Sequence, residues 1–164
     1  MTAANDAIDG ADAIPRWLLD NPLGVSIRPD NVRAQLEPTQ DWETRFHRLL
    51  ALGEQLPVLP AAVRIDANRL HGCQATVWVA HTFDRVAGRL YLNCASDTRL
   101  VTGLLACLLS GYNGQTPNAA LDFDAKSFVQ DLSFGGHIAS ERSNGLLAFI
   151  GRARMLAHRY STQT

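Results

Sequence analysis

The sequence predicts an α+β fold, in which a small antiparallel β-sheet of about three strands packs against several helices. The two clear strand-like patterns lie in the middle of the chain, within residues 75–95, whereas helical periodicity precedes and follows them. The two strand patterns are separated by a short connection, and strands joined in this way pair antiparallel. Helices grouped around one such sheet are typical of the α+β class.

The composition is that of one globular domain. The 164 residues are 46% hydrophobic and 19% charged, with a formal net charge of −1, and a chain of this length can bury a sizeable core. The sequence contains no basic run with interleaved aromatic residues, and no apolar stretch reaches the roughly 18 residues that a membrane-spanning helix needs. We therefore expect no nucleic-acid partner and no membrane partner.

The N-terminus and the cysteines favour a cytoplasmic protein. The first residues lack the basic and apolar regions of a secretory signal. Cytosolic cysteines are usually reduced, and the chain contains an odd number of them: Cys73, Cys94 and Cys107. We expect all three to be free thiols.

Residues 1–30 are predicted to form a mobile N-terminal extension, and residues 31–164 a single domain. The extension is rich in Ala, Asp, Asn and Pro. Its one amphipathic piece, residues 15–19, begins with proline, which is tolerated at the first helical position. We expect a turn or two of helix there, with Trp17 and Leu18 docking on the domain; a fully disordered leader is the alternative.

The first strong helix is predicted to begin near Asp41 and to end at Pro57. Either Thr39 or Asp41 can cap its N-terminus. Apolar residues recur at steps of three and four and so share one face of the helix. They are Trp42, Phe46, Leu49, Leu50, Gly53 and Leu56.

The sheet is predicted from two adjacent segments. Residues 75–80 are apolar and β-branched, as in a buried strand, and residues 89–95 alternate between apolar and polar side chains. Residues 81–88 form a polar connection that ends in glycine. Residues 61–68, which precede the sheet, are expected to be a loop that includes a first short strand.

The helix after the second strand has the clearest periodicity in the chain. Its apolar positions are Val101, Leu104, Leu105, Leu108 and Leu109. Ser96 and Asp97 can cap its N-terminus, and Gly111 is expected to end it.

Three further helices are predicted in the C-terminal part. A short one starts at Thr116, where a hydroxyl cap is followed by proline, and another is capped by Asp124 and runs to about Leu132. After a glycine-containing loop, Ser140 caps a final helix that reaches about His158. The residues of this helix that are expected to face inward are Leu146, Phe149, Ile150 and Ala153.

Cys73 is the residue best placed for chemistry, because it lies where a tight loop enters the sheet. Gly72 can adopt backbone angles that are closed to other residues, so a sharp turn before Cys73 is inexpensive. The strand behind the loop would hold it rigidly, leaving the thiol exposed yet fixed in position. The alternative is a buried, inert cysteine that acts as a small hydrophobic residue.

Five short motifs occur in order along the chain. They are Leu52-Gly53-Glu54-Gln55-Leu56-Pro57; Gly72-Cys73-Gln74 with Val77-Trp78; Ser96-Asp97 with Val101 and Gly103-Leu104; Tyr112 with Gln115-Thr116-Pro117; and Ser140 with Arg142-Ser143-Asn144-Gly145-Leu146. Together they resemble the SufE family, whose members accept sulfur from cysteine desulfurases during iron–sulfur cluster assembly. The resemblance runs from about Val32 to Ala157. Ala75 stands where the family often has Ser, and Thr102 where it commonly has Lys.

This resemblance implies a SufE/NifU-like fold and the role of a sulfur acceptor. Cys73 would take persulfide sulfur from a pyridoxal-phosphate-dependent cysteine desulfurase of the SufS or CsdA type and raise the turnover of that enzyme. It would then deliver the sulfur to a SufBCD-like iron–sulfur scaffold. Such a protein is a sulfur carrier and not an enzyme. It binds no cofactor or metal and holds only a transient persulfide.

Positive charge near Cys73 would help to ionise the thiol, because a free cysteine has a pKa of ~8.5. The neighbouring candidates are Arg69 and His71. The resemblance adds Arg142, whose family counterpart lies close to the reactive loop, and His137 as a weaker neighbour. Each has a structural interpretation as well: His71 as an ordinary loop residue, Arg142 as an anchor of the helix terminus and His137 as a surface residue.

Two other functions use some of the same residues. An iron–sulfur scaffold of the NifU/IscU type would use several cysteines as cluster ligands, but Cys94 and Cys107 fall on apolar faces of their predicted elements. A small hydrolase would use a Cys–His nucleophile pair, and the sequence contains no recognisable third residue to orient the histidine.

Overall fold

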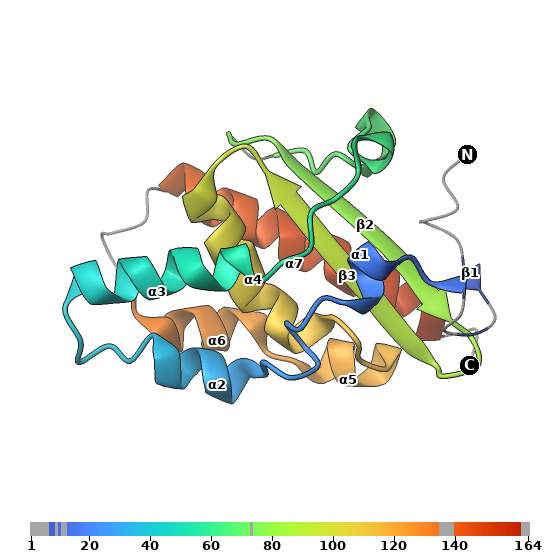
Figure 1. Cartoon of the computed structure of the whole chain (residues 1–164). Coiled ribbons are helices and arrows are strands. Elements are labelled where there is room, and N and C mark those ends of the chain that lie inside the picture. The colour runs from blue at the N-terminus through green and yellow to red at the C-terminus, as the bar shows by residue number, and fades with distance from the viewer. Residues whose placement is uncertain (1–6, 9, 11–12, 73, 135–139, 162–164) are drawn as a thin grey trace.

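The computed structural model contains a sheet with most of its helices on one side, some of them packed on the sheet and the others on those helices (Figure 1). The structure describes residues 7, 8, 10, 13–72, 74–134 and 140–161, and of these it describes only the backbone at 7, 8 and 140–143. The α+β fold that the sequence predicts is confirmed.

The centre of the sheet is an antiparallel pair of strands, β2 (Val77–Asp84) and β3 (Arg89–Ser96). Their register pairs Val77 with Ser96 at one end and Asp84 with Arg89 at the other. A third strand, β1 (Ala7–Ile8), pairs with the far end of β2 and runs parallel to it. The sheet therefore has the expected size, but its third strand comes from the N-terminal segment.

Residues 61–68 do not form the predicted first strand. They fold into two single 3-10 turns, η3 (Ala61–Val63) and η4 (Asp66–Asn68). The second turn is held by Asn68, whose buried side-chain amide donates to the Val63 carbonyl at 2.7 Å. This hydrogen bond stabilises a turn instead of the backbone pairing of a strand, which is a common effect of Asn side chains.

The predicted polar connection at residues 81–88 is wrong in its first half, because β2 continues to Asp84 and only residues 85–88 connect the strands. His81 and Asp84 are buried, and each has a polar partner. The His81 Nε2 atom lies 3.1 Å from the Tyr160 hydroxyl. One Asp84 carboxylate oxygen accepts hydrogen bonds from three backbone N–H groups, two of them in the turn that follows. Partners of this kind make the burial of polar side chains in a strand tolerable.

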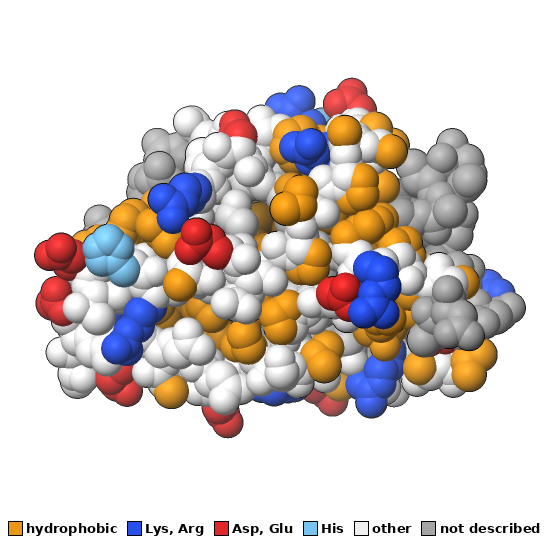
Figure 2. Space-filling view, in the orientation of Figure 1, with side chains coloured by type: hydrophobic (Ala, Val, Ile, Leu, Met, Phe, Trp, Pro, Cys, Tyr) orange, Lys and Arg blue, Asp and Glu red, His pale blue; other side chains and the backbone are white. Residues whose placement is uncertain are grey.

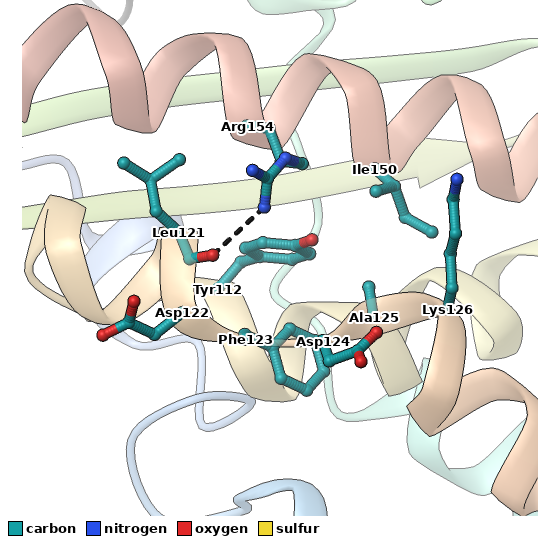
Figure 3. A pocket seen from close by; sticks show the side chains of 9 residues that line it. All are labelled: Tyr112, Leu121, Asp122, Phe123, Asp124, Ala125, Lys126, Ile150 and Arg154. Carbon is teal, nitrogen blue, oxygen red and sulfur yellow. Dashed lines mark hydrogen bonds between the residues drawn. The ribbon is translucent and has the colours of Figure 1, made fainter.

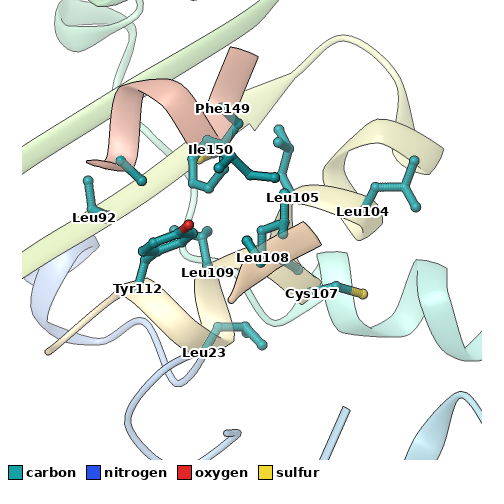
Figure 4. Close-up of a cluster of buried hydrophobic side chains, with 14 of the residues drawn as sticks. Leu23, Leu92, Leu104, Leu105, Cys107, Leu108, Leu109, Tyr112, Phe149 and Ile150 are labelled. Atoms are coloured by element: carbon teal, nitrogen blue, oxygen red, sulfur yellow. The ribbon is translucent and has the colours of Figure 1, made fainter. Parts of the chain in front are cut away.

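Two long helices, α4 (Arg99–Tyr112) and α7 (Ser140–Ser161), form most of the helical layer over the sheet. α3 (Trp42–Glu54) packs on α4 at very short range. A Cβ atom added to Gly103 would lie 2.5 Å from the Leu49 carbonyl oxygen, so only glycine allows this approach. Figure 4 shows the core that these helices enclose, with Leu105, Leu108 and Phe149 among its buried side chains.

The capping residues were predicted correctly for two helices and missed for one. Thr116 caps α5 (Pro117–Asp122), and Asp124 caps α6 (Ala125–Leu132). α4, however, is capped by Thr98, whose hydroxyl accepts from the Val101 N–H at 3.2 Å. Ser96 and Asp97 are free for other contacts as a result. α4 also continues one residue beyond Gly111, and α7 ends three residues beyond His158.

The N-terminal segment covers the opposite face of the sheet with α1 (Arg16–Leu19) and continues into α2 (Pro29–Gln35), a helix that the sequence analysis missed. The expected docking of Trp17 and Leu18 is confirmed. Leu18 is fully buried, and Trp17 packs against a second apolar cluster around Ala80. The division of the chain at residue 30 stays a prediction.

The face shown in Figure 2 carries interspersed acidic and basic side chains. This distribution agrees with the net charge of −1. Within the described residues, no helix is both long enough and apolar enough to cross a bilayer.

Candidate functional site

The loop around position 73 is closed at its base by the chain on either side. The Leu70 N–H donates to the Val77 carbonyl at 2.8 Å, and Arg69 forms an antiparallel bridge with Trp78. These contacts join residues 69–70 to residues 77–78, where β2 starts, and so close the loop at its base. Cys73, the predicted sulfur-accepting thiol, lies outside the described residues.

Gly72 has the backbone conformation that the sequence analysis expects. Its φ angle is +92°, a backbone conformation that residues other than glycine rarely adopt. A Cβ atom at this position would lie 3.9 Å from the Cβ of Ala148, which belongs to α7. The loop thus turns sharply directly before position 73 and lies beside α7.

A second contact holds the other end of the loop, at Thr76. The Thr76 N–H donates to a carboxylate oxygen of Asp97 at 3.1 Å, and the Asp97 N–H donates to the Thr76 carbonyl at 3.2 Å. The pair extends the β2–β3 ladder by one step beyond Val77 and Ser96. Sequence analysis assigned Asp97 to the cap of α4, and its role beside the loop was missed.

The basic residues predicted to assist Cys73 are placed only in part. Arg69 and His71 are exposed, so both are accessible at the base of the loop. Arg142 lies in the first turns of α7, six residues before Ala148, which corresponds to about 9 Å along the helix axis. The side chain of Arg142 and all of His137 lie outside the described part of the chain, so the assignment of the site residues stays a prediction.

Cys94 and Cys107 are buried thiols within the core. Burial raises the pKa of Cys107 to about 12, and burial raises the pKa of Cys94 as well, although the charge of Arg152 opposes that rise. A thiol must lose its proton to act as a nucleophile or a metal ligand. These two cysteines therefore remain protonated and structural at neutral pH, as their positions on apolar faces predict.

No group of three or more metal-binding side chains occurs among the residues that the structure describes. The described surroundings of the loop are instead backbone contacts, one carboxylate and the flank of a helix. This arrangement holds both ends of the loop that carries position 73.

Comparison with known proteins supports the family assignment. A family model described as SufE, the Fe–S metabolism associated domain, matches residues 30–157. The chain is also 31% identical to the sulfur acceptor protein CsdE of Escherichia coli (strain K12) over 131 residues, which cover 78% of this chain and 86% of that relative. The chain therefore belongs to the SufE family of Fe–S metabolism associated proteins.

Proposed function

We propose that this protein accepts sulfur on Cys73 from the persulfide of a cysteine desulfurase and delivers it for iron–sulfur cluster assembly. The observation that carries the proposal is the family match, which spans the Gly72-Cys73-Gln74 loop. The related CsdE is named a sulfur acceptor protein. The contacts at Leu70 and Thr76, which brace the loop on both sides, are consistent with this role.

The transfer step needs only a thiolate and no net redox change. The Cys73 thiolate attacks the outer sulfur of the donor persulfide, a new S–S bond forms to Cys73, and the S–S bond in the donor breaks. The donor cysteine leaves as a thiolate, and Cys73 then carries the persulfide. The carbon–sulfur cleavage that creates the donor persulfide belongs to the pyridoxal phosphate of the desulfurase.

The basic residues would act on the ionised forms of Cys73. A guanidinium can hydrogen-bond a persulfide anion or nearby loop carbonyls, and we assign this role to Arg142. His71 and Arg69 would add positive potential at the base of the loop, which favours the thiolate. The partner would be a desulfurase of the SufS or CsdA type, and a SufBCD-like scaffold would receive the sulfur in the cytoplasm.

An iron–sulfur scaffold of the NifU/IscU type is the weaker alternative. A scaffold needs several thiolate ligands that converge on one site, whereas Cys94 and Cys107 are buried and have raised pKa values. They cannot join Cys73 as ligands without unpacking the core.

The test is a sulfur-transfer assay. The protein is mixed with a cysteine desulfurase and cysteine without reductant, and the peptides are analysed by mass spectrometry. The Cys73 peptide should gain the mass of one sulfur atom, and Cys73→Ser should lose both this adduct and the stimulation of the desulfurase. Cys107→Ala serves as the matched control and should keep both. An unaltered stimulation and sulfur delivery in Cys73→Ser would reject the proposal.

A further inference from the structure

The outer face of α7 carries an exposed apolar stripe. Among the described residues five large hydrophobic side chains are exposed, and two of them lie on this helix. They are Leu147, which is 51% exposed, and Met155, which is 47% exposed. Gly151 lies midway between them, and residues spaced four apart share one face of a helix. We call these three residues the α7 stripe.

The α7 stripe is distinct from the face by which this helix enters the core. That face carries Phe149, Ile150 and Ala153, all of them buried. A Cβ atom added to Gly151 would meet nothing within 4 Å, so the middle of the stripe is open. The missing side chain leaves a gap between two exposed apolar side chains, where the surface of another molecule can approach the helix backbone closely.

The stripe begins beside the loop that carries position 73. A Cβ atom on Gly72 would lie 3.9 Å from the Cβ of Ala148, the residue that follows Leu147. Met155 comes seven residues later, which corresponds to about 11 Å along the helix axis. A specific protein interface covers about 800 Å² on each partner, equivalent to a disc with a radius of about 16 Å. A partner that docks over the loop is therefore large enough to cover the stripe.

Exposed cationic side chains border the stripe. Residues 144–161 of α7 include three arginines and one histidine but no Asp or Glu. Arg159 is exposed and follows Met155 by four residues, so it continues the stripe toward the C-terminus. Arg154 is exposed on the side of α7 that faces α5, where its Nη1 atom donates to the Leu121 carbonyl at 3.1 Å (Figure 3).

The carboxylates near Arg154 lie away from the stripe. Asp122 and Asp124 line a pocket together with Arg154 and Lys126, between α7 and the connection from α5 to α6 (Figure 3). The two acidic and two basic side chains offset one another there. The α7 stripe itself combines apolar side chains with positive charge, which suits a partner surface that is apolar at its centre and acidic at its edge.

We propose that the α7 stripe is a docking surface for the cysteine desulfurase that loads Cys73. The inference rests on the proposed function, because a sulfur donor has to approach the loop beside the stripe. A second copy of this chain fits less well, since a symmetric contact would bring the same arginines together and like charges repel. A lipid surface takes up helices with a wide apolar face, whereas this stripe has only two large side chains.

The test measures sulfur transfer to the full-length protein at increasing concentrations of the desulfurase used in the sulfur-transfer assay. Leu147→Glu and Met155→Glu each place a carboxylate in the stripe. Each should raise the desulfurase concentration that gives half the maximal rate by about tenfold. The maximal rate should stay close to that of the wild type, because neither residue belongs to the loop. Val86→Glu is the matched control, since Val86 is 77% exposed in the turn at the far end of β2, and it should change neither value.

Two further variants test the shape and the charge of the stripe. Gly151→Gln fills the gap without entering the core, so it should weaken docking although the protein unfolds at a temperature no lower than the wild type. Arg159→Gln removes one positive charge. It should raise the half-saturating concentration by about threefold at low ionic strength and have little effect at high ionic strength, because salt screens the attraction.

Unchanged half-saturation in both Leu147→Glu and Met155→Glu would overturn the proposal, as would an equal rise in Val86→Glu. Two results would assign the stripe to another occupant and also overturn it. One is a wild-type dimer in size-exclusion chromatography that Leu147→Glu dissociates, and the other is co-sedimentation with phosphatidylglycerol vesicles that Leu147→Glu abolishes.

The proposed function has its own readout in the same assay. If the wild type acquires no sulfur at any desulfurase concentration, the proposed function fails and the docking surface with it. Normal sulfur transfer with unchanged half-saturation in the stripe variants rejects the docking surface alone.

Discussion

Asp97 and Thr76 form a reciprocal pair at the end of the Cys73 loop, with hydrogen bonds of 3.1 and 3.2 Å between them. One bond uses the Asp97 carboxylate and the other uses only backbone atoms. The carboxylate is therefore the part of this contact that mutation can remove. Because Asp97 follows β3 directly, the pair ties the end of the loop to that strand.

Asp97→Ala should slow sulfur uptake by Cys73 and reduce stability by about 0.5–1.5 kcal/mol, the usual contribution of one hydrogen bond. Urea unfolding and the rate of persulfide formation measure the two effects. Asp97→Asn keeps an oxygen acceptor and should restore most of the rate. If Asp97→Ala loses stability but transfers sulfur at the wild-type rate, the carboxylate does not position the loop.

Gly72→Ala should impair sulfur transfer through the backbone rather than through a clash. At φ +92° an alanine is strained by roughly 1–2 kcal/mol, whereas its Cβ would meet only Ala148 at an ordinary 3.9 Å. Gly88→Ala is the matched control, because Gly88 also has a positive φ, of +67°, and its Cβ would contact nothing within 4 Å.

Both variants should therefore lose similar stability in thermal unfolding, but only Gly72→Ala should slow desulfurase-dependent sulfur uptake. Equal transfer rates in the two variants would mean that the turn at Gly72 matters for folding alone.

The buried thiol of Cys107 should make stability fall at alkaline pH. Its pKa is raised to about 12 in the folded state, whereas an unfolded cysteine ionises near ~8.5. Below the unfolded value both states are protonated and the full stability is present. Above it the unfolded state loses its proton first, so the free energy of unfolding should drop by about 1.4 kcal/mol per pH unit.

Urea unfolding at pH 8 and pH 10 measures this dependence, with the wild type and Cys107→Ala compared at each pH. The alanine variant lacks the ionisable group and should show a shallower fall between the two values. An identical fall in both proteins would assign the alkaline sensitivity to other groups.

Substitution by alanine should have opposite effects at two helical glycines, Gly103 in α4 and Gly151 in α7. Gly103→Ala would place a Cβ 2.5 Å from the Leu49 carbonyl oxygen, so the helices must separate, and we expect a loss of roughly 1–3 kcal/mol. Gly151→Ala, in α7, meets nothing within 4 Å.

Because alanine favours a helix over glycine, Gly151→Ala should gain up to about 1 kcal/mol. Thermal or urea unfolding of the two variants tests the difference. A loss at both positions would show that the two helices respond to the added methyl group for a reason other than packing.

Several predictions from sequence succeeded because their cause is local. Thr116 and Asp124 cap their helices because a side-chain oxygen reaches an N–H only three residues along the chain. The stripe of α4 was recognisable because its apolar residues repeat with the period of the helix itself. Arg45, in contrast, interrupts the expected pattern of α3. It is buried and donates to the carbonyls of Leu36 and Leu132, and no local rule indicates those partners.

The amino-acid sequence alone determined the α+β class, the order of the main helices and the family motif around Cys73, because periodicity, caps and motifs act over a few residues. Only the tertiary structure decided that β2 continues through His81 and that Asp97 holds Thr76. Each of these depends on residues at least 21 positions apart in the chain. Polar groups can be buried in such places only where the fold brings a partner to them.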